Sequence, residues 1–358
     1  MDRRKFLEAL SVLSTSSAFA GAPSPITLSN AATPLAGSET FENDNIDRTP
    51  RIGVIAVGSA GGEMLTNLYG KLPHLSHSIA IDTNPGALHS VTADQKILVA
   101  GQESDWLGNT PARMTLPSDV QIQLADAVAD LDIAFLVAEM DGVAGTFVAP
   151  AVAEVLRERP VIAIGAAVTP FIFENQQRQR IALAGTHALS RIMNVVFPIP
   201  NELLAQSEHH EGLLSFSSTA MFERLYRSAV LPIAEPGLIN FDAETIRLIT
   251  SKNGYAAMGY GSACGADADV TAARQAIAHP LLGKRRLRSA SGILFSVEGS
   301  PVLTKLGAVC RIVKSIRNTI GEVDHEQIIF CGAIRNETLT NEFRVTILAG
   351  GILAEENV

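Results

Sequence analysis

Cysteine, aromatic residues and charged residues are all scarce in this chain. Its 358 residues include three cysteines and one tryptophan, aromatic residues make up 5% and charged residues 18%. The cysteines, at positions 264, 310 and 331, are far apart and form no Cys-x-x-Cys pair. This spacing indicates neither a zinc cluster nor a disulfide framework, so we interpret the cysteines as small buried hydrophobic residues.

Long runs of basic residues are missing as well. The formal net charge is −9, whereas nucleic-acid binding needs clustered Lys and Arg to neutralise phosphates. The exception is KRRLR at residues 284–288, for which a solvated loop is the simplest interpretation. The adjacent His209 and His210 do not have the spacing of metal ligands. We therefore expect no nucleic-acid partner and no metal held by the protein alone.

Hydrophobic residues, in contrast, make up 47% of the chain. A chain of this length and composition buries a sizeable core and can form two domains of ordinary size. We therefore expect a globular protein.

Residues 1–22 are predicted to be a signal or a membrane anchor. They combine a basic cluster, a mildly apolar stretch and an Ala-x-Ala site at residues 18–20, as secretory signals do. The start, RRKFL at residues 3–7, resembles the twin-arginine export signature. The same stretch also fits a helix whose apolar residues, from Phe6 to Leu13, lie on one side, as in an interfacial anchor. Two alternatives stay open: the protein is exported, or it stays in the cytoplasm with residues 1–20 as its tether to a membrane.

Residues 23–50 are rich in Ser, Pro, Asn and Thr and are predicted to be a flexible linker. After it, apolar runs alternate with helical patterns. Strands are expected at 52–57, 77–83, 96–101, 132–138 and 160–168, with helical stretches between them. This alternation predicts an α/β fold with a doubly wound, mainly parallel sheet, whose ligands bind at the carboxyl ends of the strands.

Two loops of small residues each join a strand to a helix. GSAGG at 58–62 and EMDGVAG at 139–145 stand where the unpaired N–H groups of a helix start can bind an anion. No lysine follows the first loop, which excludes the Walker phosphate loop. Asp82 lies 21 residues beyond Gly61, where a ribose-binding acid would stand. An NAD-binding dehydrogenase is therefore one alternative.

Seven stretches, in this order, resemble the FtsZ branch of the tubulin superfamily. They are IGVIAVGSAGGEMLTNL, EMDGVAGTFVAPAVAEVLRE, VTPFIFENQQR, FPIPNELL, EPGLINFDAETIR, NGYAAMGYGSACG and NEFRVTILAGGI. The resemblance implies a nucleotide-binding domain at 51–212, a long central helix at 213–236 and a second, smaller α/β domain at 237–352. It also implies GTP with magnesium, hydrolysed only between subunits of a head-to-tail homo-oligomer.

The resemblance assigns roles to individual residues. The first phosphate loop of the family is matched by Gly58, Gly61 and Gly62, and the signature loop GGGTGTG keeps Gly142, Gly145 and Thr146. The pair that reaches ribose and phosphate is matched by Glu174 and Arg178, and a residue on the base side by Asn201. In the loop that completes the neighbouring subunit's site, the catalytic positions are matched by Asn240 and Asp242.

The chain also departs from the family's motifs. In the signature loop, side chains replace glycine or threonine at Asp141, Val143, Ala144 and Phe147, so we expect a carboxylate and three side chains where bare backbone meets phosphate oxygens. A carboxylate close to phosphates repels them unless a cation intervenes. In the catalytic loop Thr245 occupies the place of a second Asp, and a hydroxyl cannot supply that charge. We therefore expect slow hydrolysis or none.

Three functions follow from these observations. The first is an FtsZ-like GTP-binding protein with degenerate phosphate loops that assembles head to tail in cell division or membrane remodelling. The second is a non-enzymatic scaffold with the same fold, exported or tethered to a membrane. The dehydrogenase is the third, and the signature-loop residues argue against it.

Overall fold

The computed structural model describes residues 49–100, 115–140, 142–171, 173–201, 217–250, 254–321 and 327–352. Residues from Arg48 onward form one compact unit. The predicted signal or anchor and nearly all of the predicted linker lie outside the described residues.

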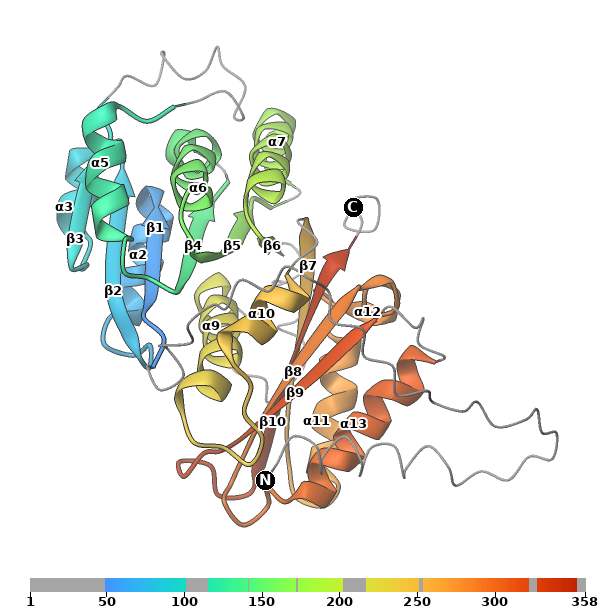
Figure 1. Cartoon of the computed structure of the whole chain (residues 1–358). Helices are drawn as coiled ribbons and strands as arrows, with labels where there is room; N and C mark the ends of the chain where they lie inside the picture. The colour runs from blue at the N-terminus through green and yellow to red at the C-terminus, as the bar shows by residue number, and fades with distance from the viewer. Residues whose placement is uncertain are drawn as a thin grey trace, which may run out of the picture. The chain divides into compact units, whose positions relative to one another are not determined.

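A single ten-stranded sheet runs through this unit, in the order β3-β2-β1-β4-β5-β6-β7-β10-β8-β9 (Figure 1). Neighbouring strands are parallel from β3 to β7 and between β8 and β9, whereas β10 is antiparallel to both of its neighbours. The strands are β1 (Ile52–Val57), β2 (Leu75–Asp82), β3 (Gln95–Leu98), β4 (Ile133–Glu139), β5 (Ile162–Thr169), β6 (Val195–Pro200), β7 (Tyr255–Cys264), β8 (Gly292–Gly299), β9 (Ile328–Arg335) and β10 (Glu342–Ile352).

Helices cover both faces of the sheet, and three large apolar clusters fill the space between the layers. One face carries α2 (Gly58–Leu68), α9 (Ser218–Ala234) and α10 (Ala243–Ile249). The other face carries, over the first strands, α5 (Ser118–Ala127), η2 (Ala144–Val148), α6 (Ala149–Arg157) and α7 (Gln176–Ile192), and over the last strands α11 (Ala268–Ala278), α12 (Gly283–Ser289) and α13 (Leu306–Ile320). A short helix, α3 (Pro85–Ser90), follows β2.

The predicted fold class is confirmed, and all five predicted strands are present within a few residues of their expected bounds. Two local expectations differ. The first glycine loop is already the first turn of α2, since the helix begins at Gly58. The basic stretch KRRLR belongs to the helix α12 and is not a loop, because the buried Leu287 anchors it on the third apolar cluster.

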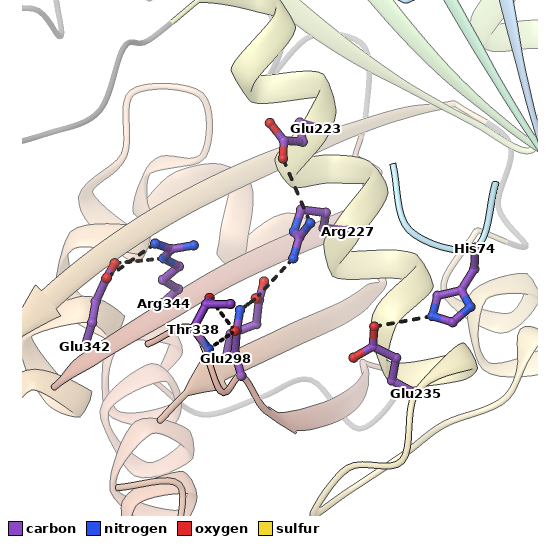
Figure 2. A network of polar contacts seen from close by, with 9 residues as sticks. His74, Glu223, Arg227, Glu235, Glu298, Thr338, Glu342 and Arg344 are labelled. Atoms are coloured by element: carbon purple, nitrogen blue, oxygen red, sulfur yellow. Dashed lines mark hydrogen bonds and ion pairs between the residues drawn. The ribbon is translucent and has the colours of Figure 1, made fainter. Parts of the chain in front are cut away.

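Polar contacts join α9 to the elements on either side of it (Figure 2). Arg227 on α9 lies 3.9 Å from Glu298 of β8, which also accepts a hydrogen bond from the Asn336 amide at 3.1 Å. At the end of α9, Glu235 pairs with His74 at 3.3 Å. The helix is therefore held both to the segment before β2 and to the last strands. None of the helices in the described ranges has the length and apolar character that a membrane crossing requires.

Candidate functional site

A cavity of about 390 Å³ opens at the carboxyl ends of β1, β2 and β4. The chain order reverses between β1 and β4, and this is the place in a doubly wound sheet where ligands bind. The cavity walls are formed by Val57, Gly58, Ser59, Ala60, Asp82, Thr83, Asn84, Glu139, Gly142, Val143, Ala144 and Gly145. Both predicted phosphate loops therefore meet at one site.

The first wall is the start of α2. Gly58 has a φ of +83°, a conformation that only glycine adopts at little cost, and it turns the chain from β1 directly into the helix. Gly61 packs closely on the sheet, because a Cβ there would lie 3.0 Å from the Val137 carbonyl oxygen. The first residues of α2 line the cavity, so amide groups without a helical acceptor stand at its wall. Gly62 is buried against Val91 and supports the helix from behind.

The second wall is the start of η2, a π-helical turn that continues into α6. A Cβ on Gly145 would collide with the carbonyl oxygen of Glu139, so only glycine lets this turn approach the end of β4. The Thr146 amide donates to the Gly142 carbonyl at 3.0 Å in the first turn, and the first amides of a helix have no acceptor within the helix. Two helix starts thus face one cavity, and both carry the positive end of a helix dipole.

Phe147 does not obstruct the cavity, contrary to the expectation that its ring stands among the phosphate ligands. Its side chain is 5% exposed and packs in the first apolar cluster with α6 and the sheet. Thr146 also turns away from the cavity, since it is fully buried against Gly185 of α7. Val143 and Ala144 do line the cavity, as expected, and Asp141 lies outside the described residues.

The cavity is acidic. Asp82 is 3% exposed and accepts hydrogen bonds from the Ser59 hydroxyl at 3.0 Å and from the Asn84 backbone amide at 2.9 Å. Glu139 is the second carboxylate among the lining residues, and no Lys or Arg is among them. The described part of the chain holds no group of three or more His, Cys, Asp or Glu side chains fit for a metal ion. The sequence pattern indicates Asp82 only as a ribose ligand and does not single out Glu139, although each of these residues is the last of a strand that neighbours β1.

Three other predicted binding residues lie away from these walls. Glu174 accepts a hydrogen bond from the Phe171 amide at 2.8 Å and pairs with Arg178 at 3.1 Å, one helical turn away. The two therefore engage each other on the exposed start of α7 and do not line the cavity. Asn201 directly follows β6 and also stands outside the cavity lining.

The two predicted catalytic residues hold the segment between α9 and α10. The Asn240 side-chain amide donates to the carbonyl oxygens of Pro232 at 2.8 Å and Glu235 at 2.6 Å, and its own oxygen accepts from the Gly237 amide. Asp242 caps α10 by accepting from the Thr245 amide and hydroxyl, both at 2.8 Å. Neither residue lines the cavity. Within one chain, both stabilise the segment between α9 and α10.

Comparisons with known proteins agree with this geometry. The model of the Tubulin/FtsZ family GTPase domain matches residues 51–209, and that of the FtsZ family C-terminal domain matches residues 254–353. A cell division protein FtsZ of Bartonella bacilliformis is 31% identical over 86% of this chain and 52% of its own length. Cell division protein FtsZ 2 of Rhizobium meliloti is 31% identical over 85% of this chain and 88% of its own length. The chain thus spans about half the length of the first relative.

Solved structures show the same likeness. A mutant FtsZ of M. jannaschii superposes with a TM-score of 0.72 at 25% identity, covering 85% of this chain and 92% of that one. CetZ2 of Haloferax volcanii, solved as a GTPγS-bound protofilament, superposes with a TM-score of 0.67 at 20% identity, covering 85% and 94%. Two domain models, relatives across most of the chain and the shared fold lead to one conclusion: the chain belongs to the Tubulin/FtsZ family.

Proposed function

We propose that this protein is an FtsZ-like GTP-binding protein that assembles head to tail with copies of itself, in cell division or membrane remodelling, and hydrolyses GTP slowly or not at all. The observation that carries the proposal is the cavity at which the starts of α2 and η2 meet. Family membership and the protofilament of CetZ2 support nucleotide binding and assembly.

The cavity fits a chain of phosphates. Its volume of about 390 Å³ lies within the range of roughly 300–1,000 Å³ that small-molecule sites occupy. Gly58 and Gly145 bring backbone close to the cavity at points where a side chain would strain or block the turn. Backbone amides at two helix starts supply hydrogen bonds to anionic oxygens without any basic side chain.

The acidic wall gives magnesium a defined place in this proposal. Asp82 and Glu139 are the described carboxylates that would hold the ion or its water shell, and oxygen ligands are those that magnesium prefers. When bound, the ion would neutralise phosphate charge that no Lys or Arg of the cavity wall offsets. We therefore expect nucleotide affinity to depend strongly on magnesium.

Slow hydrolysis follows from the segment between α9 and α10, which in the family completes the neighbouring subunit's site. The Asp242 carboxylate accepts a hydrogen bond from the Thr245 hydroxyl, and the Asn240 side chain makes hydrogen bonds to three backbone groups. Positioning an attacking water by these side chains would require breaking the hydrogen bonds that shape the loop.

Equilibrium dialysis of the full chain against GTP, GDP and ATP, with and without magnesium, tests the proposal. Gly142→Ala is the test variant: Gly142 lines the cavity, and a Cβ there meets no protein atom within 4 Å, so the substitution should not disturb the fold. Gly307→Ala on α13 is the control, since its Cβ is equally unobstructed and far along the chain from the cavity. In the presence of magnesium we expect GTP to bind the unmodified chain and Gly307→Ala with the same affinity. Gly142→Ala should bind GTP at least tenfold more weakly than either. Equal GTP binding by the two variants would exclude this cavity.

A second candidate function is a non-enzymatic scaffold, exported or membrane-tethered. The hydrogen bonding of Asn240 and Asp242 within the subunit favours it. Light scattering separates the two candidates: assembly that is the same with GTP, with GDP and without nucleotide supports the scaffold, whereas assembly only with GTP supports the first proposal.

A further inference from the structure

We propose that the outer surface of α12 and α13 is a binding face for anionic lipid membranes. This surface, the basic face, consists of five exposed side chains: Lys284, Arg285, Arg288, Lys314 and Arg317. The inference does not depend on nucleotide binding.

Positive charge is concentrated on these two helices. Together α12 and α13 carry seven Lys or Arg residues and no Asp or Glu, although the chain as a whole has a net charge of −9. One of the seven, Arg311, is neutralised by the buried Asp269 of α11 at 2.7 Å. The acidic residues of the stretch EVDHE, at 322–326, follow α13 and lie outside the described residues.

The fold turns these cations outward. The apolar side of α13 is buried in the third apolar cluster through Val309, Ile312 and Ile316, and α12 is anchored there by Leu287. The Arg288 guanidinium donates to the Thr319 carbonyl at 3.1 Å, which fixes α12 to the last turn of α13. Two packed helices therefore present a fixed array of cations, since α13 alone is about 22 Å long.

A lipid surface suits this array better than a nucleic acid. Clusters of four to eight Lys or Arg on an amphipathic helix are typical of binding to anionic lipids. Neither helix carries an aromatic side chain on which a base could stack. Stable membrane association needs two signals, and the basic, partly apolar stretch at residues 1–22 can supply the other.

Vesicle flotation of the full chain tests the proposal. The vesicles contain either phosphatidylcholine alone or equal parts of phosphatidylcholine and phosphatidylglycerol. The test variant combines Lys284→Gln, Lys314→Gln and Arg317→Gln. The control combines Lys71→Gln, Arg159→Gln and Arg191→Gln, which are exposed cations on other elements and change the net charge equally. All three proteins keep residues 1–50, so differences between them report the basic face.

We expect the unmodified chain and the control to bind the anionic vesicles, and the test variant to bind on the order of 100-fold more weakly, since each basic residue near an anionic surface contributes about fivefold. Binding of the unmodified chain should fall steeply with salt, because attraction extends only about 10 Å at 0.1 M ionic strength. Thermal unfolding of the variants checks that they fold.

Three results would overturn the proposal. The first is equal vesicle binding by the test variant and the control, or, should the test variant not fold, equal binding of the unmodified chain to both vesicle types. The second is loss of duplex DNA binding in the test variant with vesicle binding intact, which would assign the face to nucleic acid. The third is a dimer in sedimentation velocity that the test variant abolishes while vesicle binding persists, which would assign the face to a second copy.

Discussion

Replacing Gly58 by alanine separates the role of this glycine in the fold from its role in the cavity. Its φ of +83° lies in the left-handed region, where an L-residue costs about 1–2 kcal/mol. The added Cβ would also lie 3.3 Å from the Ala144 Cβ, between the two cavity walls. Gly70, at the turn after α2, is a matched control, because its φ is +73° and its Cβ would meet nothing within 4 Å.

Urea denaturation and calorimetric GTP titration are carried out on both variants. We expect Gly58→Ala and Gly70→Ala each to lower the free energy of unfolding by about 1–2 kcal/mol, because in both variants an alanine must adopt a positive φ. Only Gly58→Ala should lose GTP affinity, by at least tenfold, because only its methyl group pushes on the cavity wall. GTP affinity of Gly58→Ala equal to that of Gly70→Ala and of the unmodified chain would show that nucleotide does not bind between these two walls.

Three further predictions concern single side chains. Phe147→Ala should lower the free energy of unfolding by about 3–5 kcal/mol without tightening GTP binding, because the ring fills the core and not the cavity; a tenfold gain in calorimetric affinity would contradict this. Burial, and secondarily the charge of Arg224, lowers the pKa of His279 to about 4 from 6.5. Between these two pH values the unfolded chain therefore binds a proton more readily than the folded chain does. The free energy of unfolding should decline by about 3 kcal/mol as the pH falls from 6.5 to 4. Urea denaturation of His279→Gln over this pH range should lack this part of the decline. Thr245→Asp should lower the free energy of unfolding by roughly 2–4 kcal/mol at pH 7, because it buries a second carboxylate beside Asp242; an unchanged urea midpoint would argue against it.

The sequence was sufficient to predict the alternation of strands and helices and the meeting of two loops. β-branched runs such as residues 52–57 are long enough to be recognised, and parallel strands bring their carboxyl ends to one edge. Gly58 and Gly145 can be singled out through their match to the loops of the family, and the structure supplies the physical reason: Gly58 has a φ of +83°, and a Cβ on Gly145 would collide with the Glu139 carbonyl oxygen.

The direction of individual side chains could not be predicted in the same way. Phe147 stands one residue after Thr146, and only the π-helical turn of η2 determines that its ring enters the core. Similarly, Asn240 and Asp242 match catalytic positions in a linear motif, but their hydrogen bonds depend on carbonyl groups contributed by the end of α9 and on the start of α10. The basic stretch 284–288 becomes a face only because α13 packs beside it.

Amide hydrogen exchange of the full chain, with and without magnesium and GTP, reports directly whether nucleotide binds at the two cavity walls. We expect slower exchange on nucleotide addition at residues 58–60 and 143–145, the parts of the two helix starts that line the cavity. The start of α5, at residues 118–121, should exchange unchanged, since it is a helix start outside the cavity lining. Unchanged exchange at both cavity walls under saturating GTP would show that this cavity is not the nucleotide site.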